Sequence, residues 1–358
     1  MQTVTPLADR FSTEQIHLVE SDRQVNAARF SPCGEFLVAG GFEGEVRRWN
    51  IAGKTPEELP KLEGHHAWVE GIAFEASRNL LFSADSWGEI RAWNYRDEKP
   101  ATQWTIADAH DGWIRRLVVS PNGKLLASCG QDQRVKLWHT ADGKPVRNLT
   151  GHDQDVFCIA FHPGGKCLLS GDARGIVKQW DLASGECTRS FDASLLYLYH
   201  RIQDVGGVRA LSFSPDGSLL AVGGTKPKNG GTVQGIPTLL VYDFESGDLQ
   251  HTLELGAAND CYVHEAHLHP AGFAMVVTCG TPGTGQLRFQ QLDAQEPFFQ
   301  FKKASNPHSL SLHPDGTTLA LTATNKGSNG NGRRLGKDGE YAGNTSPVYV
   351  FELKVKEG

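Results

Sequence analysis

Three side chains near the middle of the chain are of the types that hydrolases use for bond cleavage. His110, Ser128 and Asp132 could supply a general base, a nucleophile and an orienting carboxylate. A catalytic triad is defined by geometry rather than by residue types, because the histidine must reach both the serine and the carboxylate. The role of these three residues therefore depends on the elements that carry them.

The segment HEAHLHP, with His264, His267 and His269, is a second place where chemistry is conceivable. Histidine is a frequent metal ligand, but the segment lacks the HExxH spacing of a zinc site. His267 and His269 alternate along an expected strand. His269 also stands directly before a proline, as His162 and His313 do elsewhere. We read these histidines as strand and turn residues, and we predict neither a metal ion nor another cofactor.

The composition is that of a folded globular chain with a slight excess of acidic residues. The 358 residues are 39% hydrophobic and carry a formal net charge of -6. This charge gives no electrostatic footprint for nucleic acid or for a membrane surface, so neither is an expected partner. The 7 cysteines show no CxxC pair or zinc-ligand spacing. Without a leader pattern or a long apolar segment, we predict a soluble, cytoplasmic, monomeric protein.

A repeated unit organises the chain. Seven copies of a short apolar segment occur, and a turn containing Pro and Gly follows all but the second copy. The copies begin at Val25, Val69, Ile114, Val156, Val208, Val263 and Pro307. A second apolar run follows each copy, and a third run then ends in Trp49, Trp93, Trp138, Trp180, Tyr242, Phe289 or Phe351. The four tryptophans are 44, 45 and 42 residues apart, which is typical of a four-stranded β unit.

The first strand of each unit departs from regular alternation. Its apolar positions fall at 0, +3 and +5, as in Val156, Ile159 and Phe161. One extra residue in a strand of period two predicts a β-bulge near its start.

These units resemble WD40 repeats over essentially the whole chain. The signature of that family is Gly-His before the first strand and Trp-Asp at the end of the third. The first motif appears as GHHAWV from Gly64, AHDGWI at His110 and GHDQDV from Gly151, and the second as WN at Trp49 and Trp93 and WD at Trp180. Copies five to seven keep the strand pattern but lose the His and the Trp. The resemblance implies an all-β, seven-bladed propeller with four-stranded antiparallel blades.

By the same resemblance, the apparent triad belongs to a buried hydrogen-bond network. In the third copy the indole of Trp138 would bond to the hydroxyl of Ser128. That hydroxyl would bond to the imidazole of His110, and the imidazole would bond to the carboxylate of Asp132. The second and fourth copies keep part of this set, namely His65, Ser83, Trp93, His152, Ser170 and Trp180. They carry Trp87 and Arg174 where the third copy has Asp132. We therefore expect their networks to be incomplete.

The last copy ends with its third strand, at VYVFEL, so its outer strand must come from elsewhere. Residues 13–20 precede the first copy in the position of a blade's last strand. Pairing of the two chain ends would close the ring and limit its exposed edges. We therefore expect residues 1–358 to form a single domain, with long loops on its top face at about 192–207, 223–237 and 322–347.

The resemblance also indicates where a partner would bind. In WD40 proteins the starts of the first strands, and the turns between strands two and three, surround the top mouth of the central channel. We call the residue at which each copy begins, from Val25 to Pro307, the anchor of its first strand. The residues just before the anchors are Gln24, Trp68, Trp113, Asp155, Gly207, Tyr262 and Asn306. Those just after it are Asn26, Glu70, Arg115, Phe157, Arg209, His264 and His308, and the turns add Phe42 and Trp87. The aromatic, charged and histidine members of these sets are the candidate partner-binding residues.

The sequence favours a non-catalytic protein–protein interaction scaffold that binds a peptide or protein segment at this mouth. The alternative is a propeller hydrolase or lyase with a metal or acid/base site at the central channel. Its only plausible set is Glu70, Asp155, His264 and His308. These residues come from different blades and form no recognised catalytic motif, so we expect no catalytic residues.

Overall fold

The chain folds almost entirely into β-strands. The computed structural model describes residues 6–200, 202–229, 234–258, 261–280, 284–324 and 345–356. These residues form seven four-stranded antiparallel sheets and one two-stranded sheet, with the short helices α1 (Leu7–Arg10) and η1 (Ser194–Leu196). No helix among them is long and apolar enough to cross a bilayer.

The first four blades follow one another along the chain. Blade one contains β2 (Val25–Phe30), β3 (Phe36–Gly41), β4 (Val46–Asn50) and β5 (Glu57–Leu62). Blade two contains β6 (Val69–Glu75), β7 (Leu80–Asp85), β8 (Ile90–Asn94) and β9 (Thr102–Ile106). Blade three contains β10 (Ile114–Val119), β11 (Leu125–Gly130), β12 (Val135–His139) and β13 (Pro145–Leu149). Blade four contains β14 (Val156–Phe161), β15 (Cys167–Asp172), β16 (Ile176–Asp181) and β17 (Cys187–Asp192).

A small hairpin, β18 (Tyr197–His200) and β19 (Gln203–Gly206), precedes the remaining blades. Blade five contains β20 (Val208–Phe213), β21 (Leu219–Asn229), β22 (Gln234–Asp243) and β23 (Leu249–Glu254). Blade six contains β24 (Tyr262–His269), β25 (Phe273–Cys279), β26 (Gln286–Gln291) and β27 (Phe299–Phe301). Blade seven combines β28 (Ser305–Leu312), β29 (Thr318–Thr324) and β30 (Val348–Val355) with β1 (Phe11–Val19).

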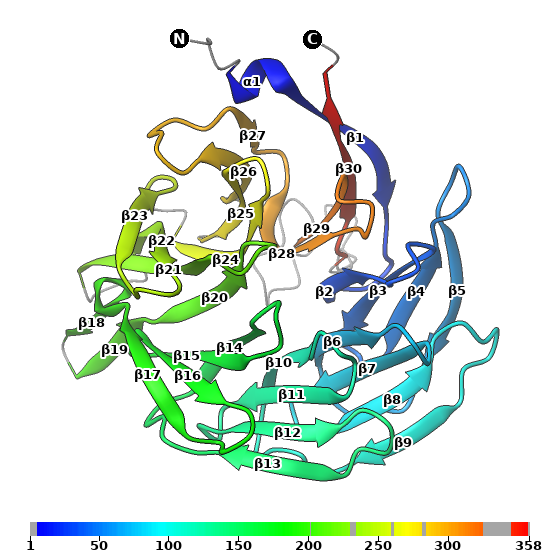
Figure 1. Cartoon of the computed structure of the whole chain (residues 1–358). Helices are drawn as coiled ribbons and strands as arrows, with labels where there is room; N and C mark the ends of the chain where they lie inside the picture. Colours follow the sequence, from blue (N-terminus) through cyan, green and yellow to red (C-terminus); the bar gives the residue numbers. More distant parts are fainter. Residues whose placement is uncertain are drawn as a thin grey trace.

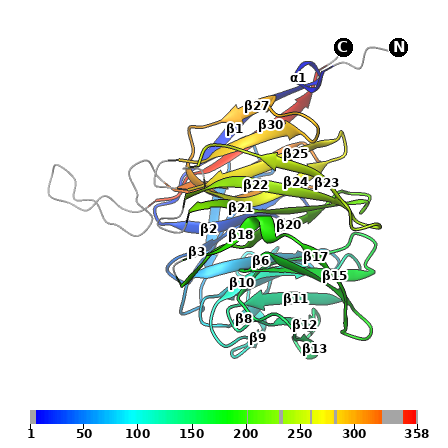
Figure 2. The same cartoon turned by 90° about the vertical axis from the view of Figure 1, so that its left-hand side faces the viewer.

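The seven blades stand around a common axis. Their first strands lie innermost and their last strands at the periphery, as Figure 1 shows along the axis and Figure 2 from the side. The predicted seven-bladed, all-β propeller is confirmed. Because each sheet is nearly radial, the first strands together line the centre of the ring.

A register shift near the start of every first strand confirms the predicted bulge. In blade three, Ile114 pairs with Gly130 and Arg116 with Cys129, so Arg115 is the extra residue. The first strands of the other blades shift in the same region. The bulge increases the local bend of the strand. It therefore sets the direction of the residue that follows each anchor.

The ring is closed by strands from the two ends of the chain. β1 pairs antiparallel with β30, from Phe11 opposite Val355 to Val19 opposite Val348. The two strands lie side by side in both views (Figures 1 and 2). The closing strand, expected at residues 13–20, thus begins two residues earlier and ends one residue earlier. Its pairing satisfies the backbone groups along the outer edge of β30.

The hydrophobic core is divided among the spaces between neighbouring blades. The seven aromatic residues that end the third strands are all buried. Trp93 of blade two shares one cluster with Val38 and Val46 of blade one, and Trp180 of blade four shares another with Leu137 of blade three. Each blade is therefore stabilised by its neighbours, and none buries its apolar surface alone.

The expected long loops contain regular secondary structure where the structure describes them. Segment 192–207 contains η1 and the β18–β19 hairpin. Segment 223–237 belongs mostly to β21 and β22, which extend past the blade as a hairpin. Strand pairing satisfies backbone N–H and C=O groups that a loop would leave to solvent. Most of the third loop, residues 325–344, lies outside the described residues.

Deleting residues 1–20 should open the ring. The outer edge of β30 would lose its partner, and an unpaired edge associates readily with other chains. We expect a lower thermal unfolding temperature and concentration-dependent oligomers, measured by scanning calorimetry and light scattering. The matched control is Ile16→Ala, since this β1 side chain is 39% exposed and should contribute little. A truncated chain that stays monomeric and unfolds at the original temperature would contradict this closure.

Candidate functional site

His110 is the centre of a buried hydrogen-bond chain in blade three. Its Nε2 lies 2.7 Å from Ser128 Oγ and its Nδ1 lies 2.8 Å from Asp132 Oδ1. The indole N–H of Trp138 donates to Ser128 Oγ at 2.9 Å. Ser128 is completely buried, so a substrate could not reach its hydroxyl. The histidine reaches both the serine and the carboxylate, as in a triad, but because the serine is buried under Trp138 the three residues form a structural network.

The protonation of this network follows from its contacts. Burial lowers the pKa of His110, which favours the neutral imidazole. Burial raises the pKa of Asp132, but the hydrogen bond from His110, together with the nearby positive charge of Lys136, outweighs this and brings that pKa to about 2. A neutral ring whose Nδ1–H donates to the carboxylate satisfies both groups, and leaves Nε2 to accept the serine proton.

The networks of blades two and four are complete, so the prediction that they lack a carboxylate is wrong. His65 Nδ1 lies 3.0 Å from Asp85 Oδ2, and His152 Nδ1 lies 2.7 Å from Asp172 Oδ2. The Nε2 atoms lie 2.7 Å from Ser83 and Ser170, which accept indole N–H bonds from Trp93 and Trp180. Both carboxylates belong to the last residue of the second strand, whereas Asp132 lies in the turn.

A repeated spacing in the sequence was the signal for these carboxylates. An aspartate follows Ser83 and Ser170 by two residues in both SAD and SGD. In blade two, Asp85 also accepts the backbone N–H groups of Trp87 and Glu89, each at 3.0 Å. The same carboxylate thus holds the histidine and shapes the turn.

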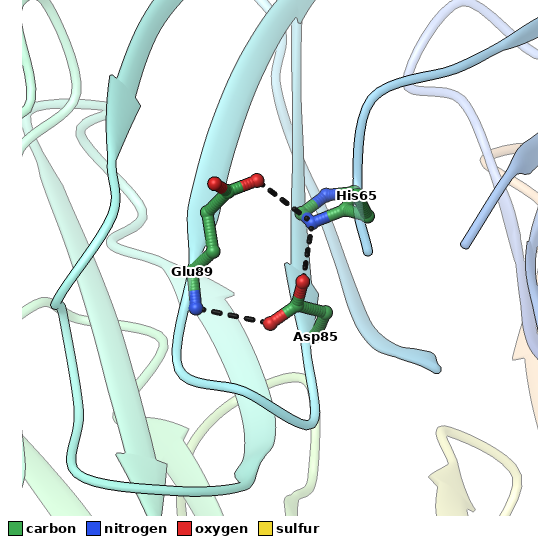
Figure 3. A group of neighbouring side chains, drawn as sticks. All are labelled: His65, Asp85 and Glu89. Atoms are coloured by element: carbon green, nitrogen blue, oxygen red, sulfur yellow. Dashed lines mark hydrogen bonds and ion pairs between the residues drawn. The ribbon is translucent and has the colours of Figure 1, made fainter. Parts of the chain in front are cut away.

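Figure 3 shows His65, Asp85 and Glu89, which have donor atoms of the kinds that metal ions use. Glu89 Oε1 lies 3.3 Å from His65 Nδ1, in addition to the Asp85 contact. Because Ser83 accepts the indole proton, its own hydroxyl can donate to His65 Nε2, and Nδ1 then carries the ring proton. A protonated Nδ1 directed at carboxylates is a hydrogen-bond donor, so we assign the group to the network.

An aromatic groove lies at the starts of the first strands of blades two and three and at the turns that follow the second strands of blades one and two. It is a depression of about 350 Å³ lined by Phe42, Glu43, His66, Ala67, Trp68, Ser86, Trp87 and Trp113. The ring of Trp68 lies 5.0 Å from that of Phe42 and 5.6 Å from that of Trp113. Trp68 is 38% exposed and Trp87 is 70% exposed. The structure therefore brings these four predicted aromatics together.

Backbone hydrogen bonds within each blade fix the positions of these aromatics. The N–H of Ser86, in the turn after β7, donates to the carbonyl of Trp68 at 2.9 Å, and that of Gln131 donates to Trp113 at 2.9 Å. Phe42 N–H likewise donates to Gln24 at 3.2 Å. The groove is thus held by the frame of the blades.

A channel pocket lies beside the groove at the same end of the ring. It has a volume of about 210 Å³ and is lined by Asn26, Ala27, Glu70, Arg115, Arg116, Phe157, Arg209, His264 and His308. Seven of these are the residues that directly follow the seven anchors. The bulges thus direct one predicted side chain from every blade into one pocket.

Arginines and aromatic rings alternate from the groove across the pocket. The guanidinium of Arg115 lies 4.2 Å from the ring centre of Trp113 and 5.3 Å from that of Phe157. Arg209 lies 3.6 Å from the Phe157 ring and 5.3 Å from the Tyr262 ring. Each such contact contributes about 0.5–2 kcal/mol. This alternation joins the two hollows into one continuous surface.

Glu265 makes a buried cluster of charges that the sequence analysis missed. Its Oε1 lies 2.7 Å from Arg29 and 2.8 Å from Arg116, and its Oε2 accepts the N–H of Leu310 at 2.8 Å. Burial raises the pKa of Glu265, but the two arginines outweigh it and bring that pKa to about 2. Four blades are joined at this carboxylate.

A positional signal for this cluster was present in the sequence. The second residue after the anchor is small in the other five copies, namely Ala27, Gly71, Cys158, Ala210 and Ser309. Only Arg116 and Glu265 are long and charged there. Opposite charges at the same repeat position indicate a contact across the ring axis.

The histidines of HEAHLHP do not converge on one point. His264 lines the channel pocket, His267 Nε2 lies 3.2 Å from the carbonyl oxygen of Leu310, and His269 Nδ1 accepts the N–H of Ala271 at 3.1 Å. Burial, followed by nearby positive charge, lowers the pKa of His264 to about 3. His264 is therefore uncharged at neutral pH.

The residues of the acid/base alternative are only partly together. Glu70, His264 and His308 line the channel pocket, whereas Asp155 is not among its lining residues. Glu70 lies 3.6 Å from Arg115, and burial raises its pKa. Both ring nitrogens of His308 lie within 3.2 Å of backbone carbonyl oxygens. Such contacts hold side chains in place, and none of them pairs an acid with a base.

Comparison with known proteins decides the family. The family model described as WD domain, G-beta repeat matches residues 13–50, 56–94, 102–139, 143–181 and 197–233, more than half of the chain. The chain belongs to the WD40-repeat family. In this WD40 protein, the first four matched ranges are offset from the blades by one strand, whereas the fifth begins with β18 of the hairpin. Range 13–50 begins with β1 of blade seven, and range 56–94 begins with β5 of blade one.

Curated relatives of this WD40 protein match only in part. Protein groucho of Drosophila melanogaster is 23% identical over 209 residues, which is 58% of this chain and 21% of that protein. Nuclear distribution protein PAC1-2 of Uncinocarpus reesii is 28% identical over 200 residues, 48% of this chain and 43% of that protein. Target of rapamycin complex subunit wat1 of Schizosaccharomyces pombe is 28% identical over 206 residues, which is 58% of this chain and 48% of that protein. The match thus covers less than half of each relative.

Replacing Asp85 with alanine should destabilise the protein. His65 and the turn amides would lose a buried acceptor, at a cost of about 1–3 kcal/mol in the free energy of unfolding. Urea denaturation followed by fluorescence measures this change. Trp87→Ala is the control, because that side chain is 70% exposed and should contribute much less. Equal losses for the two variants would show that Asp85 does not complete the network.

Replacing Glu265 with glutamine should cost stability in a pH-dependent way. The pKa of Glu265 is about 2, below its ordinary value of 4.5, so the ionised carboxylate stabilises the folded state above about pH 4.5. This stabilisation is lost as the pH falls towards 2. We expect a loss of about 3 kcal/mol or more at pH 7, and a smaller difference from the wild type at roughly pH 3.5.

Urea titrations at the two pH values test this expectation. Glu14→Gln is the control, because its ion pair with Lys354 is exposed and contributes little. A difference between Glu265→Gln and the wild type that does not depend on pH would contradict the assigned role of the carboxylate.

Proposed function

We propose that this WD40 protein is a non-catalytic scaffold that binds a peptide or protein segment at the top mouth of the propeller. The single observation that supports this most is the aromatic groove. Trp68 and Trp87 are exposed there beside Phe42 and Trp113, whereas the aromatics that end the third strands are buried. Large apolar side chains that gather at an exposed site are typical of recognition surfaces.

The shape of the mouth favours an extended segment as the ligand. The alternating rings and guanidinium groups run from Phe42 in blade one to Tyr262 in blade six. A segment lying along this row could place successive side chains in the groove and in the channel pocket. Such a segment loses its own conformational freedom on binding, but meets a surface that is already ordered.

The relatives are compatible with this role. By its name, wat1 of S. pombe is a subunit of a complex. A protein partner for the present chain is proposed by analogy, because a propeller fold by itself does not specify function. The predictions of a monomeric and cytoplasmic protein stay predictions.

Selection from a random twelve-residue peptide library with blocked ends tests the proposal. Peptides enriched on the wild-type protein should bind Trp68→Ala roughly 30-fold more weakly in fluorescence anisotropy, the loss typical of a hot-spot residue. Tyr199→Ala is the matched control, because Tyr199 is 59% exposed on β18, outside the groove. Peptides that bind Trp68→Ala as tightly as the wild type would overturn the top-mouth assignment.

A further inference from the structure

Two half-buried arginines of the channel pocket, Arg115 and Arg209, have weaker polar contacts than the other half-buried arginines near the ring axis. Among the described residues, Arg209 makes one hydrogen bond, to the carbonyl of Gly206 at 3.4 Å. Within the same part of the chain, the one carboxylate in an ion pair with Arg115 is Glu70, at 3.6 Å. The Nε atoms of both arginines are buried and have no hydrogen-bond partner among the described residues. An unsatisfied charged donor costs free energy unless a ligand completes it.

Other arginines of this chain show what complete contacts look like. Arg29 and Arg116 share the carboxylate of Glu265 at 2.7 and 2.8 Å. Arg48 makes no ion pair with a carboxylate in the described part of the chain, but it donates to several backbone carbonyls, including that of Tyr95 at 3.0 Å. Arg209 has neither kind of arrangement, and burial lowers its pKa. Its contacts within the chain therefore leave its charge largely uncompensated.

Aromatic rings hold the two guanidinium groups at the pocket. Arg209 lies 3.6 Å from the ring centre of Phe157, and Arg115 lies 4.2 Å from that of Trp113. Rings pack against the guanidinium faces, whereas the N–H groups point outward in the guanidinium plane. That plane is where a carboxylate accepts two parallel hydrogen bonds. The stacking thus prepares both groups for a planar anion.

The charges around the pocket match one negative charge. Arg115, Arg116 and Arg209 line the pocket, and Arg29 shares the carboxylate of Glu265 with Arg116. The carboxylates that interact with them are Glu70, Asp155 and Glu265. Four positive groups and three negative groups leave one positive charge, which a carboxylate would neutralise. A phosphate that carries two charges would exceed it.

We infer that the channel pocket binds a carboxylate of the partner segment, held between Arg115 and Arg209. This inference rests on the proposed function, because it names the chemistry of the segment bound at the same mouth. Trp113 lines the aromatic groove and also stacks on Arg115. The acidic group therefore lies within a few residues of the apolar side chain that occupies the groove. The carboxylate belongs to an Asp or Glu side chain, or to the chain end.

The peptides selected in the preceding experiment provide the probe. They should carry Asp or Glu at a fixed distance from an aromatic or large aliphatic residue. Replacing that acid by its amide should weaken binding to the wild type at least tenfold, as expected for a charge-assisted hydrogen bond. The same replacement should hardly change binding to Arg209→Gln. Arg134→Gln, an exposed arginine outside the pocket, is the control and should behave as the wild type does.

A second arm separates the two sources of carboxylate. The library is presented again with free carboxyl ends, and the enriched peptides are compared with their amidated forms. If amidation of the chain end weakens binding tenfold, the pocket binds a terminal carboxylate. If binding weakens only when Asp or Glu is replaced, the pocket binds a side-chain carboxylate. Arg209→Lys keeps the charge but not the planar fork, so it should lose most of the preference for acidic peptides.

The outcomes distinguish this inference from the proposed function. Peptides that require Trp68 but show no acidic preference would overturn the inference and leave the proposed function standing. Equal effects of the acid-to-amide change on the wild type and on Arg209→Gln would also overturn it, because the two groups would then not be coupled. If no selected peptide depends on Trp68, both proposals fail together.

Discussion

The pairing of β1 with β30 is the constraint on which the rest of the molecule depends. Each of the first four matched WD40 repeats contributes the outer strand of one blade and the three inner strands of the next, and the cores lie between blades. A ring that stayed open would expose two apolar blade faces and one strand edge. The charges at Glu265 depend on the same closure, since Arg29 and Leu310 come from blades on opposite sides of the seam. The β1–β30 pairing at the periphery and the ion pairs of Glu265 near the axis therefore stabilise the same closed ring.

The candidate binding surface derives from regular parts of the fold. Its residues stand just before and just after the anchor of each inner strand, where a bulge bends the backbone. Turn amides hold the preceding residue by backbone hydrogen bonds. Side chains from all seven blades thus meet at one mouth in positions that are set before any partner arrives. Such preorganisation lowers the entropic cost of binding.

The repeat pattern explains which parts could be predicted from the sequence. Turn residues, apolar spacing and the aromatic ends of the third strands recur, so the blades, the bulges and the residues of the mouth could be placed by position. The carboxylates of Asp85 and Asp172 were misplaced because only the turn position of Asp132 was considered. The Glu265 cluster joins residues 149 and 236 positions apart. Its signal, the opposite charges of Arg116 and Glu265 at one repeat position, was overlooked, and the position of Arg29 gave no such signal. The β18–β19 hairpin interrupts the repeat, so no other copy indicated its strands.

The two positions of the network carboxylate have a consequence for how a blade divides its tasks. In blade three the turn residue Asp132 must serve the histidine, so that position is committed to the interior. In blade two the strand residue Asp85 serves it instead, and the equivalent turn position is released. Trp87 occupies the released position, and it is the most exposed ring of the groove. When the acidic residue of the network lies two positions earlier, at the end of the strand, the turn residue is free to face a ligand. The buried hydrogen-bond network of the blade stays complete.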